Sequence, residues 1–297
     1  MSETNETPRY YVPHSSVWPI VGSTALFVTA FGAVSMIHQT TEKVTTEGAY
    51  GAPIFYLGVA MIVFMMFGWF RNVIKESLAG MVSGQLDRSF RQGMAWFIVS
   101  EIMFFAAFFG ALSYARVISV PWLAGAGSNL ETHIRLWPDF ADTWPLFMTP
   151  GGTATEAMEA WGLPFINTVI LVTSSLTITF AHWALKKNRR GPLIGWLALT
   201  VVLGATFLVL QVVEYIHAFD DLGLNLDSGI YGSTFFMLTG FHGSHVTLGA
   251  IMLTVMLFRC MKGHFTPDNH FAFEATSWYW HFVDVVWLFL FTFVYWF

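Results

Sequence analysis

Three acidic side chains lie in long apolar stretches of this chain, where a charged group is most costly. Glu101 is the eighth residue after the start of the stretch 93–114, so a helix would place it about 12 Å along its length. Glu214 and Asp284 lie in two later stretches. A carboxylate at such depth costs several kcal/mol unless it is protonated, paired or faces protein. The rest of the chain must therefore supply a protein interior for Glu101 above all.

The three acids have structural as well as functional explanations. Each could pair with a neighbouring helix. Glu214 lies near the end of its stretch, where hydration could explain it. Asp284 follows His281 by three residues, and positions i and i+3 share a helix face. A mutual hydrogen bond is the simple expectation for that pair.

Histidines form the second group with chemical potential. His242 and His245 are spaced at i and i+3 in GFHGSHV, and with His182, His217 and His281 they could suggest a haem or metal site. HxxH spacing alone is a weak signal, and a bound metal would need more ligands at one level. The single cysteine, Cys260, excludes an internal disulfide and a multi-cysteine cluster. We expect structural histidines and no metal ligand.

The composition identifies the elements that carry these residues. The chain has 297 residues, of which 55% are hydrophobic and 11% charged, whereas soluble domains have about 25% charged residues. The apolar runs lack the alternation of a β-barrel. The polar N-terminus has no basic segment before an apolar core, so we expect no cleaved signal peptide. The sequence predicts an all-α, polytopic membrane protein.

Seven apolar runs are long enough to cross a bilayer as helices. They cover residues 17–37, 53–70, 93–114, 163–185, 192–217, 232–259 and 271–297. With the N-terminus inside, 11 of the 14 Lys and Arg residues fall in inside segments. The positive-inside rule therefore predicts an inside N-terminus and an outside C-terminus. Residues 116–162 form a long outside connection with several tryptophans, which favours an interfacial cap.

We expect one membrane domain over residues 1–297. Its helices 1–2 (residues 16–72) and helices 3–7 (residues 93–297) are separated by the charged segment 71–92. Basic residues follow helices 2 and 6, including Arg71, Lys75, Arg259 and Lys262, with Glu76 and His264 beside them. The positive-inside bias explains most of them, and a site for lipid headgroups is the functional alternative.

Five segments carry a resemblance to a known family. They read WFRNVIKES (69–77), GMAWFIVSEIMFF (93–105), FLVLQVVEY (207–215), YGSTFFMLTGFHGSHVT (231–247) and FAFEATSWYWHFVDVVWLFLFTFVYWF (271–297). These closely resemble subunit III of the haem–copper cytochrome c oxidases. The resemblance covers nearly all the membrane segments and covers residues 116–162 poorly. That connection is longer than in compact mitochondrial members, which points to a bacterial inner-membrane protein.

The resemblance implies a seven-helix accessory subunit with no haem, copper or active site of its own. Helices 1–2 and helices 3–7 would enclose a V-shaped cleft filled with phospholipid. The subunit would dock on the catalytic subunit I, with subunit II in the same complex and haem and copper in these partners. That complex reduces dioxygen to water and pumps protons in aerobic respiration. Subunit III would support proton uptake and protect the complex from inactivation.

Individual residues match functional positions of the family. Glu101 matches a carbodiimide-reactive buried carboxylate, and such reactivity fits a carboxyl group kept protonated by burial. The lipid-binding positions match Glu76, His245, Arg259, Lys262, His264 and Thr266. Two departures stand out: Phe70 replaces an expected indole, and residues 78–92 lack histidines found in the animal proteins.

Two other classes of function remain open at this point. A membrane redox protein could ligate haem through His242, His245 or His281. A proton or ion transporter could use Glu101 and Glu214, but few polar groups lie between them. An isolated chain with stoichiometric haem or copper would favour the redox protein, and coupled flux in proteoliposomes would favour the transporter.

Overall fold

The computed structural model describes residues 15–41, 50–145, 148–149, 152 and 154–296. These residues form helices and no strand, with one isolated bridge between Met148 and Ala154. Seven helical spans among them are long and apolar enough to cross a membrane. The predicted all-α fold with seven membrane helices is therefore confirmed. The helices are α1 (Trp18–Thr41), α2 (Gly51–Leu78), α3 (Gly84–Tyr114), α4 (Val120–Leu123), α5 (Leu130–Leu136), α6 (Leu163–Lys186), α7 (Arg190–Asp220), α8 (Ile230–Met261) and α9 (Phe271–Leu290).

Several helices continue beyond the apolar runs that predict them. The charged segment 71–92 is mostly helical, because α2 continues to Leu78 and α3 begins at Gly84. After α3, a π-helix (η1, Ala115–Ser119) and α4 continue the helical span to Leu123. The first residues of the predicted connection 116–162 are therefore helical, up to Leu123. Pro121 lies at the start of α4, directly after the π-helical turn of η1.

The chain divides into two compact units, Met1–Phe90 and Arg91–Phe297. In the first, α1 and α2 pack closely through glycines. A Cβ atom at Gly32 would overlap the backbone of Phe55, and one at Gly58 would overlap Thr29. Only glycine allows the two backbones to approach so closely.

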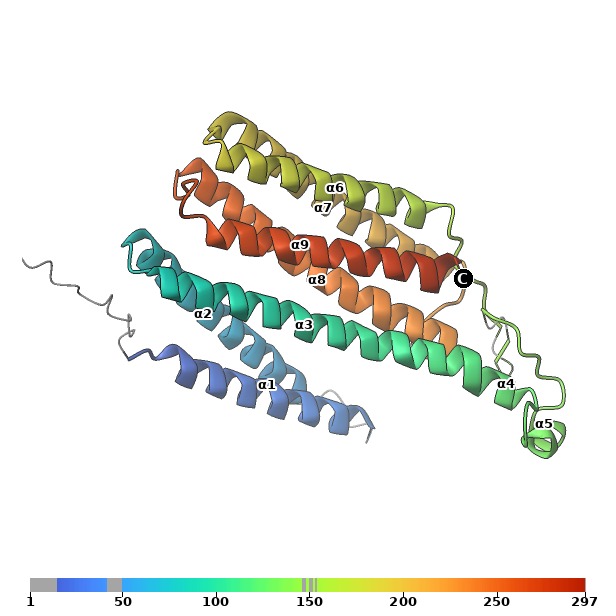
Figure 1. Ribbon diagram of the computed structural model, residues 1–297. Helices are drawn as coiled ribbons and strands as arrows, with labels where there is room; N and C mark the ends of the chain where they lie inside the picture. The colour runs from blue at the N-terminus through green and yellow to red at the C-terminus, as the bar shows by residue number, and fades with distance from the viewer. Residues whose placement is uncertain (1–14, 42–49, 146–147, 150–151, 153, 297) are drawn as a thin grey trace, which may run out of the picture. The chain divides into compact units, whose positions relative to one another are not determined.

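The second unit contains most of α3 and the helices α6 to α9, which run side by side (Figure 1). Its core surrounds α9, where Trp280, Trp287 and Phe273 are almost completely buried. The Trp280 indole N–H donates to the Ser174 hydroxyl of α6 over 2.8 Å. The C-terminal residues continue α9 as a second π-helix, η2 (Phe291–Trp296).

In the remaining connection, residues 124–162, the described residues contact the loop between α7 and α8 and the start of α8. The backbone N–H of Glu156 donates to the Leu222 carbonyl (3.2 Å), and that of Met158 donates to the Tyr231 hydroxyl (3.4 Å). The Trp144 ring packs edge-on against Tyr231, and the Arg116 guanidinium lies over Trp144. These contacts make the connection a cap on this end of the second unit.

Candidate functional site

Glu101 of α3 and His245 of α8 form a close pair inside the second unit. The Glu101 Oε2 and His245 Nε2 atoms are 2.8 Å apart, and 21% and 14% of the two side chains are exposed. The other ring nitrogen of His245, Nδ1, is 2.7 Å from the Phe241 carbonyl oxygen, one turn earlier in α8. Glu101 therefore has a histidine partner, which lies 144 residues later in the chain.

The two hydrogen-bond contacts of His245 determine how many protons the Glu101–His245 pair carries and where they lie. A carbonyl oxygen only accepts hydrogen bonds, so Nδ1 carries a hydrogen and donates to Phe241. The short contact at Nε2 then requires one further proton between Nε2 and the Glu101 carboxyl group. It joins either an imidazolium to a carboxylate or a neutral imidazole to a carboxylic acid. Both states are neutral overall, which makes the pair compatible with a membrane interior.

Aromatic rings surround the pair. The His245 ring lies 5.1 Å from Phe105, 6.0 Å from Phe104 and 6.4 Å from Tyr279, measured between centroids. The Tyr279 hydroxyl donates to the backbone carbonyl of His245 over 3.3 Å. These apolar neighbours keep competing hydrogen-bond donors away and thereby strengthen the Glu101–His245 interaction.

Glu214 is completely buried, so the expectation that hydration explains it is wrong. Its Oε1 atom accepts a 2.6 Å hydrogen bond from the Tyr295 hydroxyl of η2. The side chain points between helices, although Glu214 lies near the end of α7. Position along a helix predicts depth but does not determine which face a side chain is on.

The hydrogen bond expected between His281 and Asp284 is absent. His281 Nδ1 instead lies 2.6 Å from the hydroxyl oxygen of Ser175 in α6. Neither carboxylate oxygen of Asp284 has a hydrogen-bond partner among the described residues, and only 5% of the residue is exposed. A neighbouring helix supplies the partner of His281, which a pattern within one helix cannot reveal.

The five candidate histidines do not converge. His242 Nε2 is 3.1 Å from the Val283 carbonyl oxygen, and its ring packs on Trp287. His217 pairs with Asp221, and His182 packs against the His270 ring. Within the described part of the chain, no three His, Cys, Asp or Glu side chains are grouped so that they could hold a metal ion.

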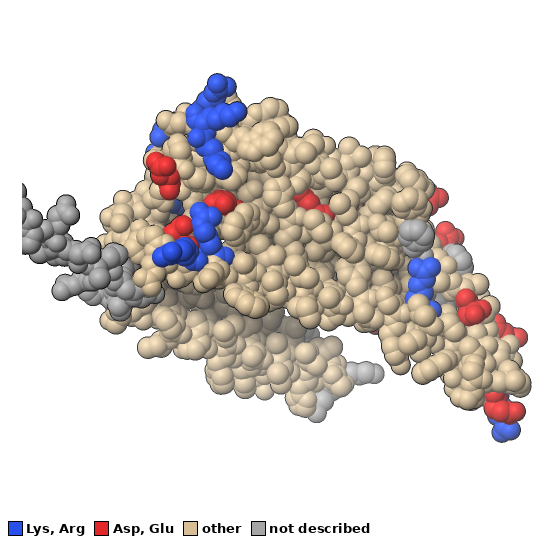
Figure 2. Space-filling model, in the orientation of Figure 1, with Lys and Arg blue, Asp and Glu red and all other residues tan. Residues whose placement is uncertain are grey.

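Basic residues gather at the end of the second unit opposite the cap. Figure 2 shows Lys and Arg over the connection between α6 and α7, and Asp and Glu over the cap. The Arg259 guanidinium lies 4.4 Å from the centroid of the Phe265 ring, and its Nε atom has no partner among the described residues. No described carboxylate forms an ion pair with Arg259.

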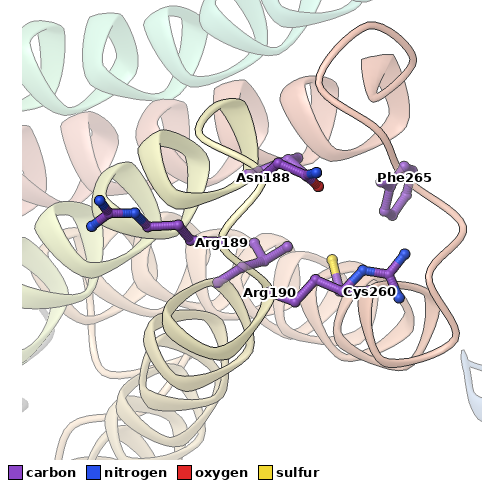
Figure 3. Close-up of a pocket in the computed structure, with 7 residues that line it drawn as sticks. Asn188, Arg189, Arg190, Cys260 and Phe265 are labelled. Atoms are coloured by element: carbon purple, nitrogen blue, oxygen red, sulfur yellow. The ribbon is translucent and has the colours of Figure 1, made fainter.

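A small pocket beside Arg259 adds a residue that the sequence does not single out. Its lining includes Cys260, Phe265 and Arg190, and Figure 3 shows the Arg190 side chain extending toward Cys260 while Arg189 points away. Arg190 Nη2 lies 3.5 Å from the Gly263 carbonyl oxygen. Arg190 and Arg259 thus approach the same thiol from two helices. Sequence reasoning missed Arg190 because the positive-inside rule explained the whole run 186–190.

The other predicted lipid-binding residues are divided between the units. Lys262, His264 and Thr266 follow α8, close to Arg259 in sequence, whereas Glu76 lies near the end of α2 in the first unit. Partial burial and the positive charges of Arg259 and Lys262 lower the pKa of His264. His264 is therefore neutral at pH 7 in the absence of an anion.

Comparison with known proteins tests the predicted family. The family model for cytochrome c oxidase subunit III matches residues 8–130 and 131–297. The chain belongs to the cytochrome c oxidase subunit III family. Cytochrome c oxidase subunit 3 of Marchantia polymorpha is 38% identical over 100% of this chain and 98% of its own length. The proteins of the same name from Madoqua guentheri (35%) and Papio hamadryas (36%) each match 99% of this chain and 98% of their own length.

Membership of the subunit III family has three consequences. The chain is an accessory subunit of a cytochrome c oxidase and a multi-pass membrane protein. The subunit III family is a cofactor-free one, so haem ligation by His242, His245 or His281 is not favoured. The family match includes residues 116–162, so the expectation that the resemblance covers this connection poorly is wrong.

Proposed function

We propose that this chain docks directly on the catalytic subunit I of a proton-pumping oxidase that also contains subunit II. Haem and copper belong to those partners, and this chain has no active site of its own. The family match along the whole chain supports this function. The sequence places 11 of the 14 Lys and Arg residues in the predicted inside segments, which supports an inside N-terminus and an outside C-terminus, and a bacterial inner membrane stays a prediction.

Co-purification tests this assignment. A tagged chain, isolated in mild detergent from native membranes, should bring down the haem- and copper-containing subunits in equal amounts. An unrelated tagged membrane protein of similar size, isolated from the same membranes, is the control. Recovery of the tagged chain without an oxygen-reducing complex would reject the proposal.

Within the complex, the Glu101–His245 pair is the proposed site of support for proton uptake. Its observed geometry requires one shared proton between two titratable groups. Such a pair can gain or pass a proton with little movement, because either partner can hold it. The reaction with dioxygen takes place elsewhere, in the catalytic subunit.

Glu101→Gln should remove carbodiimide labelling of this chain and leave assembly and much of the oxidase activity intact. Glutamine has no carboxyl group to react, but its amide can still hydrogen-bond to His245. Labelling followed by mass spectrometry, with oxygen consumption measured on the same preparation, checks both parts. Complete loss of dioxygen reduction with a normal haem content would contradict an accessory role for Glu101.

Phospholipid binding is the second proposed role. Arg259 and Arg190 form a basic site at the end of α8 without a described acidic partner, and Lys262, His264 and Thr266 follow it. An anionic headgroup supplies the missing charge, and guanidinium groups bind phosphate bidentately. Three parts of the lipid hypothesis stay predictions. They are lipid binding by Glu76, lipid binding by His245, and the lipid-filled cleft between helices 1–2 and helices 3–7.

Arg259→Gln and Arg190→Gln should each reduce the anionic phospholipid retained by the purified complex, and the double variant should lose most of it. Each guanidinium near the headgroup contributes about 1 kcal/mol, which corresponds to roughly fivefold in affinity. Arg189→Gln is the matched control, because Arg189 also lines the pocket but its guanidinium group extends away from Cys260. Quantitative lipid mass spectrometry is the measurement, and equal lipid loss in all three single variants would refute a specific site.

Anionic lipid should bind more tightly as the pH falls, because His264 can take up a proton when an anion binds beside it. Its pKa lies below the ordinary value in the absence of an anion. A bound phosphate favours the imidazolium and raises that pKa, so binding takes up a proton. The affinity can increase by at most about tenfold per pH unit for one proton. His264→Gln should remove this pH dependence; an unchanged dependence in the variant would assign it to another group.

A further inference from the structure

Polar atoms without partners are concentrated near the C-terminal end of α7. Asn167 and Glu214 are 0% exposed, and Gln211 is 6% exposed. Both side-chain amide atoms of Asn167, both of Gln211 and the Oε2 atom of Glu214 have no hydrogen-bond partner among the described residues. Tyr295 of η2, 7% exposed, donates to the other oxygen of Glu214.

The helix register places these side chains at one level. The hydroxyls of Thr177 in α6 and Thr200 in α7 are 2.8 Å apart. Asn167 precedes Thr177 by ten residues, and Gln211 follows Thr200 by eleven. Along two antiparallel helices, these intervals correspond to about 15 Å and about 16 Å in the same direction. Asn167 is therefore level with Gln211, and Glu214 lies one turn further along α7.

Tyr295 is the fourth residue of this polar group. Gln211 lies beside the Tyr295 hydroxyl but outside hydrogen-bond geometry. The Tyr295 ring is also 5.9 Å from Trp287, whose indole N–H donates to Thr168, the neighbour of Asn167. Gln211, Glu214 and Tyr295 thus form one buried polar group inside the second unit, and the helix register brings Asn167 of α6 to the same level.

Burial of a polar group without a partner is costly, because the group gives up its hydrogen bonds to bulk water and gains none. Buried polar groups in proteins are therefore bonded either to protein or to ordered water. The region offers both amide N–H donors and oxygen acceptors, so its ligand must both donate and accept. Water does both, whereas a metal cation would use the oxygens and leave the two amide NH₂ groups unpaired.

We propose that Asn167, Gln211, Glu214 and Tyr295 form a buried binding site for ordered water. A water molecule there bridges α6 to α7 and reaches the free oxygen of Glu214. Buried waters make two to four hydrogen bonds, which is what these atoms can supply. The water site fixes η2 to α7 through Tyr295, and it is separate from the Glu101–His245 pair.

Radiolytic hydroxyl labelling of the purified oxidase complex tests the site. X-rays generate hydroxyl radicals from bound water, so a buried side chain beside ordered water is labelled although bulk solvent does not reach it. Tyr295 (7% exposed) should be labelled several-fold faster than Tyr279 (2% exposed), which is also buried but donates to a backbone carbonyl instead. Labelling of Tyr295 no faster than that of Tyr279 would overturn the proposal.

Variants identify the source of the labelling. The double variant Asn167→Leu with Gln211→Met keeps side-chain volume but removes the amide groups, so labelling of Tyr295 should fall to the rate of Tyr279. Thr200→Val is the matched control, since it removes a buried hydroxyl of α7 outside the site and should leave Tyr295 labelling unchanged. An undiminished rate in the double variant overturns the site. If the double variant does not assemble, the comparison of Tyr295 with Tyr279 in the unmodified complex decides.

Discussion

His245→Leu should lower the free energy of unfolding of this chain by roughly 1–3 kcal/mol, the cost of leaving a buried polar group without its hydrogen-bond partner. The substitution leaves the Glu101 carboxyl group among aromatic rings without the imidazole that lies 2.8 Å away in the native protein. The loss of stability comes from this uncompensated acid more than from the lost packing of the ring. Unfolding of the full-length chain in mixed detergent micelles, followed by tryptophan fluorescence, measures it.

A double-mutant cycle separates these causes. Glu101→Leu combined with His245→Leu removes both polar groups and should recover most of the stability, because replacing a buried pair by apolar residues is often neutral. The double variant should retain haem content in the complex but lose carbodiimide labelling. If the two single effects simply add, Glu101 and His245 do not act as a pair.

Trp280→Ala should also destabilise the chain by roughly 3–5 kcal/mol, the range for buried aromatic residues replaced by alanine. The Trp280 ring is fully buried and fills space left by two glycines. Cβ atoms at Gly204 and Gly249 would each come within 2.8 Å of it. The variant leaves a large cavity and also removes the donor to the Ser174 hydroxyl.

Trp183→Ala is the matched control, since Trp183 is 55% exposed on α6. Its effect on the free energy of unfolding should be small by comparison. Thermal unfolding of the purified chain, monitored by circular dichroism, compares the two variants. Similar destabilisation by both would show that the interior of the second unit does not depend on the contacts of Trp280.

The membrane helices could be predicted because apolar length alone determines which segments cross a bilayer. The ends of these helices could not be predicted in the same way. Hydropathy falls where a helix leaves the membrane, but the helix continues as long as its backbone hydrogen bonds do. Residues 71–78 of α2 and 84–92 of α3 are charged and helical for this reason. The continuation of α3 to Leu123 was missed in the same way.

The partners of the buried acids could not be predicted from local sequence. Glu101 was identified by its depth, but its partner lies 144 residues away and depends on how α3 packs against α8. Glu214 and Asp284 were misjudged because helical spacing relates residues of one helix only. Their surroundings come from Tyr295 of η2 and from the burial of the α9 face. The family resemblance pointed to His245 without indicating its contact with Glu101.

The absorption spectrum and metal content of the isolated chain test its role most directly. The full-length chain should be purified in detergent away from its partner subunits and compared with the intact oxidase complex. We predict no haem absorption in the visible range and no stoichiometric iron or copper in the isolated chain, with both present in the complex. One equivalent of haem or copper retained by the isolated chain, and lost on substitution of His242 or His281, would contradict an accessory role.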